Sequence, residues 1–163
     1  MSRVLKLAVV AGVTIGLTAH AVNEGVPADQ LPSGVADKVV SVTQSGAAAE
    51  SLTVITEAVA IRETGPKETV ERFGEIYTFS PTMFAVYRDE PIRIMFRSLQ
   101  PDDLHDFMLV DSSQNRLMHI MLLPLRDTSY TFSFHMEGLF NFCCTMHQPV
   151  MRGQILVIPP RQK

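Results

Sequence analysis

Short runs of strand-forming residues, separated at fairly even spacing by turn-forming residues, occupy the sequence from about Val70 onward. One of these runs, 92–97, alternates apolar and basic residues, which is typical of a half-buried strand. Turn signals such as Ser80-Pro81 separate the runs. The expected strands are 76–79, 83–87, 92–97, 105–110, 117–122, 130–134, 139–144 and 154–158. About eight short strands in succession predict an all-β chain that folds as a Greek-key β-sandwich.

The first residues of the chain have the pattern of a secretory signal peptide. Arg3 and Lys6 precede an apolar run, 7–17, and Ala19-His20-Ala21 supplies small residues where a signal peptidase cleaves. The run is shorter than the roughly 20 residues that span a bilayer. We therefore expect residues 1–21 to be a signal peptide and the protein to be periplasmic or secreted. Membrane association is expected only if the leader is uncleaved, and a buried core helix is the alternative interpretation.

Residues 22–69 differ in composition from the rest of the chain. The stretch 22–46 is rich in Gly, Ala, Ser, Asp and Pro and poor in large apolar side chains, so we expect a poorly structured arm or linker. The segment 47–63 is ambiguous, because its apolar spacing fits a helix whereas its β-branched residues favour a first strand, the interpretation we prefer. Gly65-Pro66 then interrupts the chain. The expected β domain spans residues 70–163.

Composition and charge narrow the classes of function. Apolar residues make up 46% of the chain and charged residues 19%, which is typical of a globular domain. The formal net charge is −3, so no excess of basic residues points to nucleic acid, and we expect no such partner. The sequence also lacks a glycine-rich phosphate loop.

Two adjacent cysteines end the strand expected over 139–144. Because strand side chains alternate between faces, Phe140, Phe142 and Cys144 share one face, and the two aromatic rings mark it as the face of the core. Cys143 then points outwards. A disulfide between neighbouring cysteines would need a strained ring, so we expect the two thiols to have different roles.

The residues that follow this strand include a set of sulfur and imidazole donors. Cys144, His147 and Met151 follow one another at spacings of three and four residues. A thiolate, an imidazole and a thioether can therefore converge from one short loop onto a single ion. One cysteine and two histidines with a weak axial methionine form the donor set of blue-copper sites. The loop predicts a copper site that needs a second histidine from elsewhere in the chain.

Three further histidines lie beyond the leader. His105 begins a strand beside a turn, so its side chain lies at a strand edge next to a loop. His119 lies in the middle of a strand, and His135 lies at a turn. We therefore choose His105 as the second imidazole donor. His119 and His135 are expected to be exposed or hydrogen-bonded strand residues.

These motifs resemble those of the cupredoxins, the family of plastocyanin, azurin and amicyanin. The resemblance covers about residues 70–160, and its motifs are Phe140-x-Phe142-x-Cys144-x-x-His147-x-x-x-Met151-x-Gly153, Tyr77-x-Phe79-x-Pro81 and His105-Asp106-Phe107. It implies a cupredoxin-like sandwich that holds one type 1 copper ion. His105, Cys144 and His147 would be the equatorial ligands, and Met151 the axial one. The short loop is most similar to that of amicyanin, with one extra residue before Met151.

Three residues depart from the family's pattern. Asp106 stands where many cupredoxins have Asn, whose side chain ties the two ligand-bearing loops together in that family. We therefore expect Asp106 to pair with Thr145 or its backbone. Met146 replaces a frequent Pro and leaves the loop freer. Cys143 has no usual counterpart, and its position beside Cys144 argues against a dinuclear copper centre, in which the two cysteines are separated along a similar loop.

The preferred function is that of an exported mononuclear copper protein that carries single electrons. We expect no enzymatic activity, because four protein ligands leave no position for a substrate. His147 would be the exit point for the electron. Met146, Pro149 and Val150 around it would form an apolar surface for a redox partner such as a cytochrome, dehydrogenase or oxidase.

Two other functions are compatible with the sequence. One is copper storage, delivery or resistance, with Met118, His119, Met121 and Met136 as a second soft-donor surface, although such methionines are more often core residues. The other is a cupredoxin subunit of a larger redox assembly, tethered by residues 22–46. At the site itself, structural zinc and a metal-free domain are the alternatives.

Overall fold

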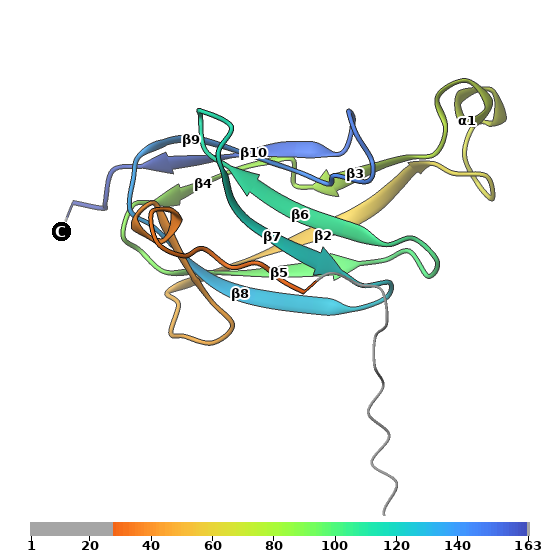
Figure 1. Cartoon of the computed structure of the whole chain (residues 1–163). Helices are drawn as coiled ribbons and strands as arrows, with labels where there is room; N and C mark the ends of the chain where they lie inside the picture. Colours follow the sequence, from red (N-terminus) through yellow and green to blue (C-terminus); the bar gives the residue numbers. More distant parts are fainter. Residues whose placement is uncertain (1–27, 163) are drawn as a thin grey trace, which may run out of the picture.

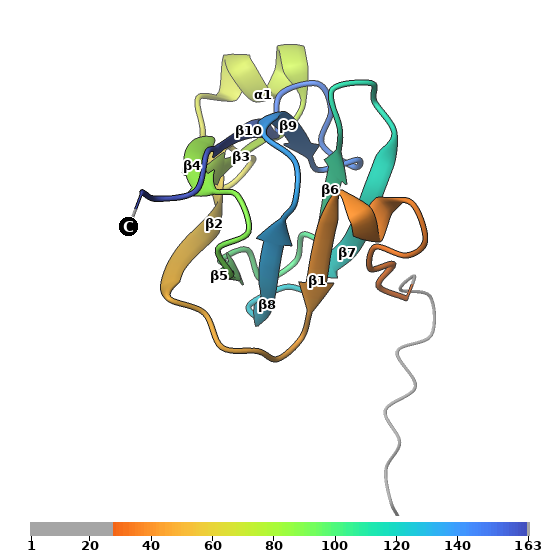
Figure 2. The same cartoon turned by 90° about the vertical axis from the view of Figure 1, so that its left-hand side faces the viewer.

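The computed structural model describes residues 28–162, which form a two-layered β-sandwich (Figure 1, Figure 2). The strands are β1 (Val40–Thr43), β2 (Glu50–Ala60), β3 (Ile76–Ser80), β4 (Met83–Tyr87), β5 (Ile92–Ser98), β6 (His105–Val110), β7 (Arg116–Leu122), β8 (Asp127–Phe134), β9 (Gly138–Cys143) and β10 (Arg152–Ile158). The helices are η1 (Ala36–Lys38), a 3-10 helix, and α1 (Lys67–Phe73). Neither helix has the length and apolarity of a membrane span. The expected signal peptide, 1–21, lies outside the described residues.

Each sheet contains five strands, in the orders β1-β8-β5-β2-β3 and β4-β10-β9-β6-β7. Most neighbouring strands are antiparallel, but β2 pairs with β5 and β4 with β10 in parallel. The chain crosses between the sheets several times, for example from β3 in the first sheet to β4 in the second. The arrangement confirms the all-β sandwich, and β3 to β10 correspond to the eight strands expected from the sequence.

Two strands precede residue 70 in the part of the chain that the structure describes, and both, β1 and β2, belong to the first sheet. β1 pairs with β8 and buries Val40 and Val42. β2 lies between β5 and β3, so the preferred strand within 47–63 is confirmed, whereas the arm expected up to residue 46 is contradicted at β1, which is part of the sheet. With two inward-facing valines in four residues, β1 has too short an alternation to be recognised in the sequence.

Helix α1 was not expected from the sequence. It begins after the Gly65-Pro66 break and ends at Gly74, whose φ of 77° favours glycine. In both views of the fold, α1 lies at the end of the sandwich where the loop between β9 and β10 also lies (Figure 1, Figure 2). The helix therefore adds to the surface around that loop.

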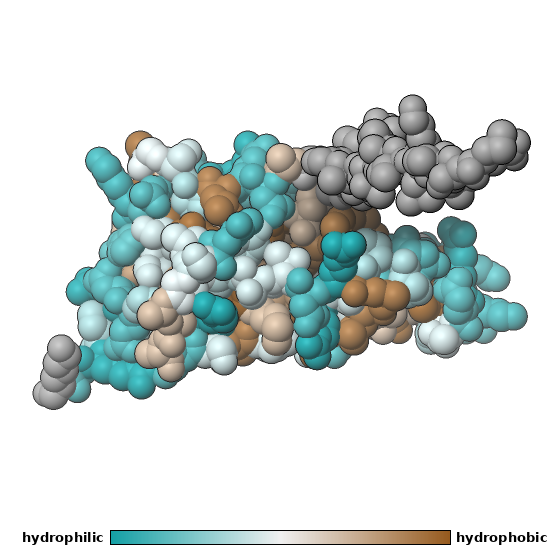
Figure 3. All heavy atoms as spheres, turned by 90° about the horizontal axis from the view of Figure 1, so that it is seen from below, coloured by the Kyte–Doolittle hydropathy of each residue, from teal (hydrophilic) through white to brown (hydrophobic). Residues whose placement is uncertain are grey.

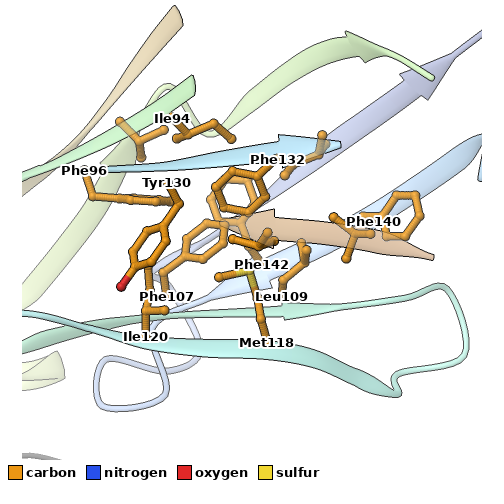
Figure 4. Close-up of a cluster of buried hydrophobic side chains, with 14 of the residues drawn as sticks. Ile94, Phe96, Phe107, Leu109, Met118, Ile120, Tyr130, Phe132, Phe140 and Phe142 are labelled. Carbon is orange, nitrogen blue, oxygen red and sulfur yellow. The ribbon is translucent and has the colours of Figure 1, made fainter. Parts of the chain in front are cut away.

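Aromatic side chains from both sheets fill the space between them (Figure 4). The Phe107 ring stacks on that of Phe142 with a centroid separation of 5.1 Å, and the Phe96 ring lies 4.7 Å from that of Phe107. Such ring pairs contribute about 0.5–1.5 kcal/mol beyond the area that they bury. Outside the core, the face seen in Figure 3 is mostly hydrophilic, with small separate hydrophobic patches.

Gly153 in β10 provides a test of this packing. A Cβ atom at this position would overlap the Phe142 ring and the carbonyl oxygen of Thr82. We expect Gly153→Ala to lower the free energy of unfolding by about 3 kcal/mol, because overpacking forces both neighbours to move. Chemical denaturation measures this loss.

The control is Gly34→Ala, since a Cβ atom at Gly34 would contact nothing within 4 Å. Only the positive φ of this position should destabilise that variant, lowering its free energy of unfolding by about 1 kcal/mol. Equal losses in the two variants would contradict the packing role of Gly153.

Candidate metal centre

His105 and Cys144 meet because of the strand pairing in the second sheet. His105 begins β6, and Cys144 directly follows β9, the antiparallel neighbour of β6. Both side chains are fully buried. The expected parity of the adjacent cysteines is confirmed, since Cys144 belongs to the core and Cys143 is only partly buried on the other face.

The short loop after Cys144 brings His147 back towards it. The Cys144 amide donates to the Met151 carbonyl over 2.9 Å, and the Met151 amide donates to the His147 carbonyl over 3.1 Å. These two bonds close the loop and hold its backbone against the end of β9. Met151 is fully buried and His147 is partly buried. The loop therefore holds one sheltered thioether residue and one imidazole that reaches the surface.

Three of the four expected ligands form a compact cluster of donor atoms. The Nδ1 atoms of His105 and His147 are 3.2 Å apart, and His147 Nδ1 lies 3.3 Å from Cys144 Sγ. One donor atom from each of the three residues lies within 4.8 Å of the others. Metal bonds of about 2.0 Å to nitrogen and 2.3 Å to sulfur separate neighbouring ligand atoms by about 3–4 Å. The spacing therefore suits coordination of a single ion.

Asp106 ties the segments of His105 and Cys144 together, as expected from the family resemblance. Its buried carboxylate accepts a hydrogen bond from the Thr145 amide over 2.5 Å and another from the Thr145 hydroxyl. His119 was not expected to take part, yet its Nε2 lies 2.8 Å from the same carboxylate. Because Asp106 follows His105 and Thr145 follows Cys144, these bonds fix the separation of the two donors.

Burial sets the protonation of the donors before any metal binds. Burial lowers the pKa of His105 to about 4, with a further contribution from nearby His147, and it also lowers the pKa of His147. Burial raises the pKa of the Cys144 thiol to about 11. At neutral pH both imidazoles are therefore neutral and ready to coordinate, whereas the thiol must lose its proton on metal binding.

Tyr77 packs against both imidazoles and, together with His147, lines the groove beside α1. Its ring centroid lies 4.9 Å from that of His105 and 4.6 Å from that of His147. Its hydroxyl donates to the Asp103 carboxylate. Burial and this carboxylate together raise the pKa of Tyr77. The phenol therefore remains neutral and acts as a polar wall of the site.

The remaining histidines have structural partners. His135 contacts Asp89 through Nδ1 and Ser41 through Nε2, each over 2.8 Å. Together with the bond from His119 to Asp106, this confirms that both histidines are hydrogen-bonded, although His135 follows β8 rather than lying in a strand. The proposed second soft-donor surface does not form as one cluster, because Met118 is a core residue whereas Met136 is exposed in the turn after β8.

The pKa of His105 predicts how the metal-free protein responds to acid. Between pH 6.5, the ordinary pKa of histidine, and about 4, the unfolded chain protonates this residue whereas the folded chain does not. The unfolded state then binds more protons, so stability falls as the pH falls through this window. Urea denaturation at pH 7 and pH 5 measures the loss.

The same measurement is made on His105→Gln. This variant lacks the imidazole, so the part of the stability loss between pH 7 and pH 5 that His105 causes should disappear. His135→Gln serves as the control for replacement of a histidine outside the cluster. If wild type and His105→Gln lose equal stability between the two pH values, the buried neutral state of His105 is refuted.

Comparisons with known proteins give matches at the level of structure. No family model matches the sequence, and no curated protein matches it significantly. Among solved structures, auracyanin B has a TM-score of 0.52 and 16% identity, over 75% of this chain and 99% of that one. Auracyanin from the photosynthetic bacterium Roseiflexus castenholzii has a TM-score of 0.51 and 15% identity, over 70% and 100%. A multicopper oxidase matches with a TM-score of 0.52 and 13% identity, over 69% of this chain and 45% of its own.

These likenesses concern the arrangement of strands, since identities of 13–16% establish the fold alone. The auracyanins are matched over nearly their whole length, so the sandwich corresponds to a complete domain of that kind. The two-sheet architecture implied by the motifs around His105 and Cys144 is confirmed. The protein has the cupredoxin fold.

Proposed function

We propose that this protein is an exported, mononuclear copper protein that carries single electrons. The observation that carries the proposal is the buried cluster of His105, Cys144 and His147, with donor atoms 3.2 and 3.3 Å apart. A thiolate and two imidazoles, with Met151 sheltered beside them, suit copper of the type 1 class. When bound, copper would supply a one-electron couple between its two oxidation states.

The environment of the cluster favours electron transfer over catalysis. His105, Cys144 and Met151 are fully buried, so none of them offers an open position to a substrate. Of the four proposed ligands, only His147 reaches the surface. A sheltered donor set keeps its geometry when the charge of the bound ion changes, and a single exposed imidazole edge gives the electron a defined exit.

We propose that the redox partner docks on the groove beside His147, which we call the docking groove. It has a volume of about 450 Å³, and its wall includes Phe73, Tyr77, Met146, Pro149 and Val150. The side chains of Phe73, Met146 and Val150 are 66%, 44% and 52% exposed. Exposed apolar side chains gathered around a hollow are typical of interaction sites.

Export is the third part of the proposal. It rests on the signal-peptide pattern of residues 1–21. A periplasmic or secreted location would expose Cys143 to an oxidising environment. Its neighbour Cys144 is protected by burial.

Two alternatives keep the same metal site. Copper storage or delivery would use Cys144 and His147 to hold copper without turnover of electrons. A subunit of a larger redox assembly is favoured by one observation, because the matched multicopper oxidase contains this fold in 45% of its chain. A stoichiometric electron exchange with a small cytochrome would distinguish the carrier from both.

Copper addition to the protein tests the metal site. We expect one Cu(II) per chain and an intense visible thiolate-to-copper band. Cys144→Ser should abolish the band, whereas Cys143→Ser should leave it nearly unchanged, because the Cys143 side chain lies on the opposite face of β9. A band that persists in Cys144→Ser, or that is lost in Cys143→Ser, would contradict the assignment of the ligand thiol.

Electron self-exchange between the oxidised and reduced forms tests the docking groove without an identified partner. Two molecules exchange electrons fastest when their His147 edges meet. We therefore expect Met146→Lys to slow self-exchange at least about tenfold, because two like charges would oppose each other. The line widths of NMR signals in mixed samples measure the rate.

Val35→Lys is the matched control, since Val35 is an exposed valine that is not part of the groove wall. It should leave the rate within about twofold. If both variants behave alike, the groove is not the route of electron exchange.

A further inference from the structure

The polar residues of the core are concentrated around the metal centre. Among residues 28–162, the buried polar or charged residues are Thr56, Ser98, Gln100, His105, Asp106 and Thr131. The first four of them form one hydrogen-bonded chain that ends on the imidazole of His105. Burying such groups costs free energy unless they are paired, and apolar residues would fill the same space without that cost. The free-energy cost of burying this hydrogen-bonded network indicates that it has a role beyond packing.

Gln100 is the central residue of this hydrogen-bonded network. Its Oε1 accepts a hydrogen bond from the Thr56 hydroxyl over 2.7 Å, and it lies 3.2 Å from His105 Nε2. Thr56 lies in β2 and is fully buried, whereas Gln100 lies in the loop that leads from β5 to His105. Thr56 is also the register partner of Ser98, the last residue of β5. The amide oxygen is thus held in place from the neighbouring strand.

This contact determines which nitrogen of His105 carries the hydrogen. The amide oxygen can only accept, so Nε2 must donate. A neutral imidazole has a single N–H, and Nδ1 therefore keeps its lone pair. That lone pair faces the cluster, because His105 Nδ1 lies 3.2 Å from His147 Nδ1.

We propose that Gln100, held in place by Thr56, is a positioning residue that keeps His105 in its Nε2–H tautomer with Nδ1 directed at the donor cluster. The protein thereby prepares one imidazole for coordination before the ion arrives. The part that concerns copper rests on the proposed function, whereas the tautomer is a property of the metal-free chain.

Imidazole ¹⁵N NMR of the metal-free protein at pH 7.5 tests the tautomer directly. We expect His105 in the wild-type protein to show a protonated Nε2 and an unprotonated Nδ1. In Gln100→Leu, which lacks the acceptor, His105 should become a mixture of both tautomers. The matched control is Gln154→Leu, which removes a glutamine bonded to Asn141 over 3.1 Å. That control should keep the wild-type pattern.

Variants of Thr56 separate positioning from folding. Thr56→Val removes the hydroxyl that holds Gln100 and keeps the shape of the side chain, so it should shift His105 partly towards the mixture. Thr56→Ser restores a hydroxyl and should restore the wild-type pattern. If Gln100→Leu does not fold, the comparison of Thr56→Val with Thr56→Ser decides.

Release of copper to a chelator tests the consequence for the loaded protein. Loss of a group that orients a metal-binding histidine typically weakens binding by about 10–100-fold. We therefore expect release about tenfold faster from Gln100→Leu, a smaller increase from Thr56→Val, and wild-type release from Thr56→Ser and Gln154→Leu.

The outcomes are distinct. A wild-type His105 protonated on Nδ1, or one tautomer retained in both Gln100→Leu and Thr56→Val, would overturn the proposal. If the wild-type chain binds no copper, the proposed function fails, and the NMR measurement still decides the role of Gln100. Unchanged copper release from a variant with mixed tautomers would overturn the part that concerns copper.

Discussion

The bond between the Asp106 carboxylate and Thr145 is the interaction on which the geometry of the candidate site depends. β6 and β9 are neighbours in one sheet, so the pairing of these strands brings His105 and Cys144 to the same end of the sandwich. Backbone hydrogen bonds close the loop after Cys144 upon itself, but they do not tie it to β6. The carboxylate anchors the first residue of that loop to the residue after His105. A buried carboxylate with several donors is strongly held, since any donor that is lost leaves a desolvated charge.

The core and the site share residues, so neither can change independently. Phe142 stacks on Phe107 in the middle of the sandwich, and each lies two residues from a proposed ligand. The same β10 backbone that follows Met151 leaves room for the Phe142 ring only because residue 153 is glycine. Rigid aromatic packing thus sets the position from which the donor atoms project.

Patterns that repeat along the chain were the part of the structure that could be predicted. The eight strands from 76 onward have enough alternation to be recognised, and the same alternation assigned Cys144 to the core. β1 was missed because its alternation is too short, and α1 because its seven residues bury no side chain. Gln100 was missed for a different reason. A single polar residue in a turn has no periodicity, and its importance depends on Thr56, which is distant in the sequence. The bond from Asp106 to Thr145 was expected from family resemblance, whereas no pattern pointed to His119.

The fold decides which of the two adjacent cysteines faces the histidines. Cys143 and Cys144 have the same chemistry and neighbouring positions, and only the pleat of β9 distinguishes them. A slip of β9 by one residue relative to β6 and β10 would turn every side chain to the other face. It would present Cys143 to the histidines and expose Phe140 and Phe142 to water. The choice between two equivalent sulfur atoms is therefore enforced by the burial of two phenylalanines, so that an error in strand alignment cannot produce an alternative site without unfolding the core.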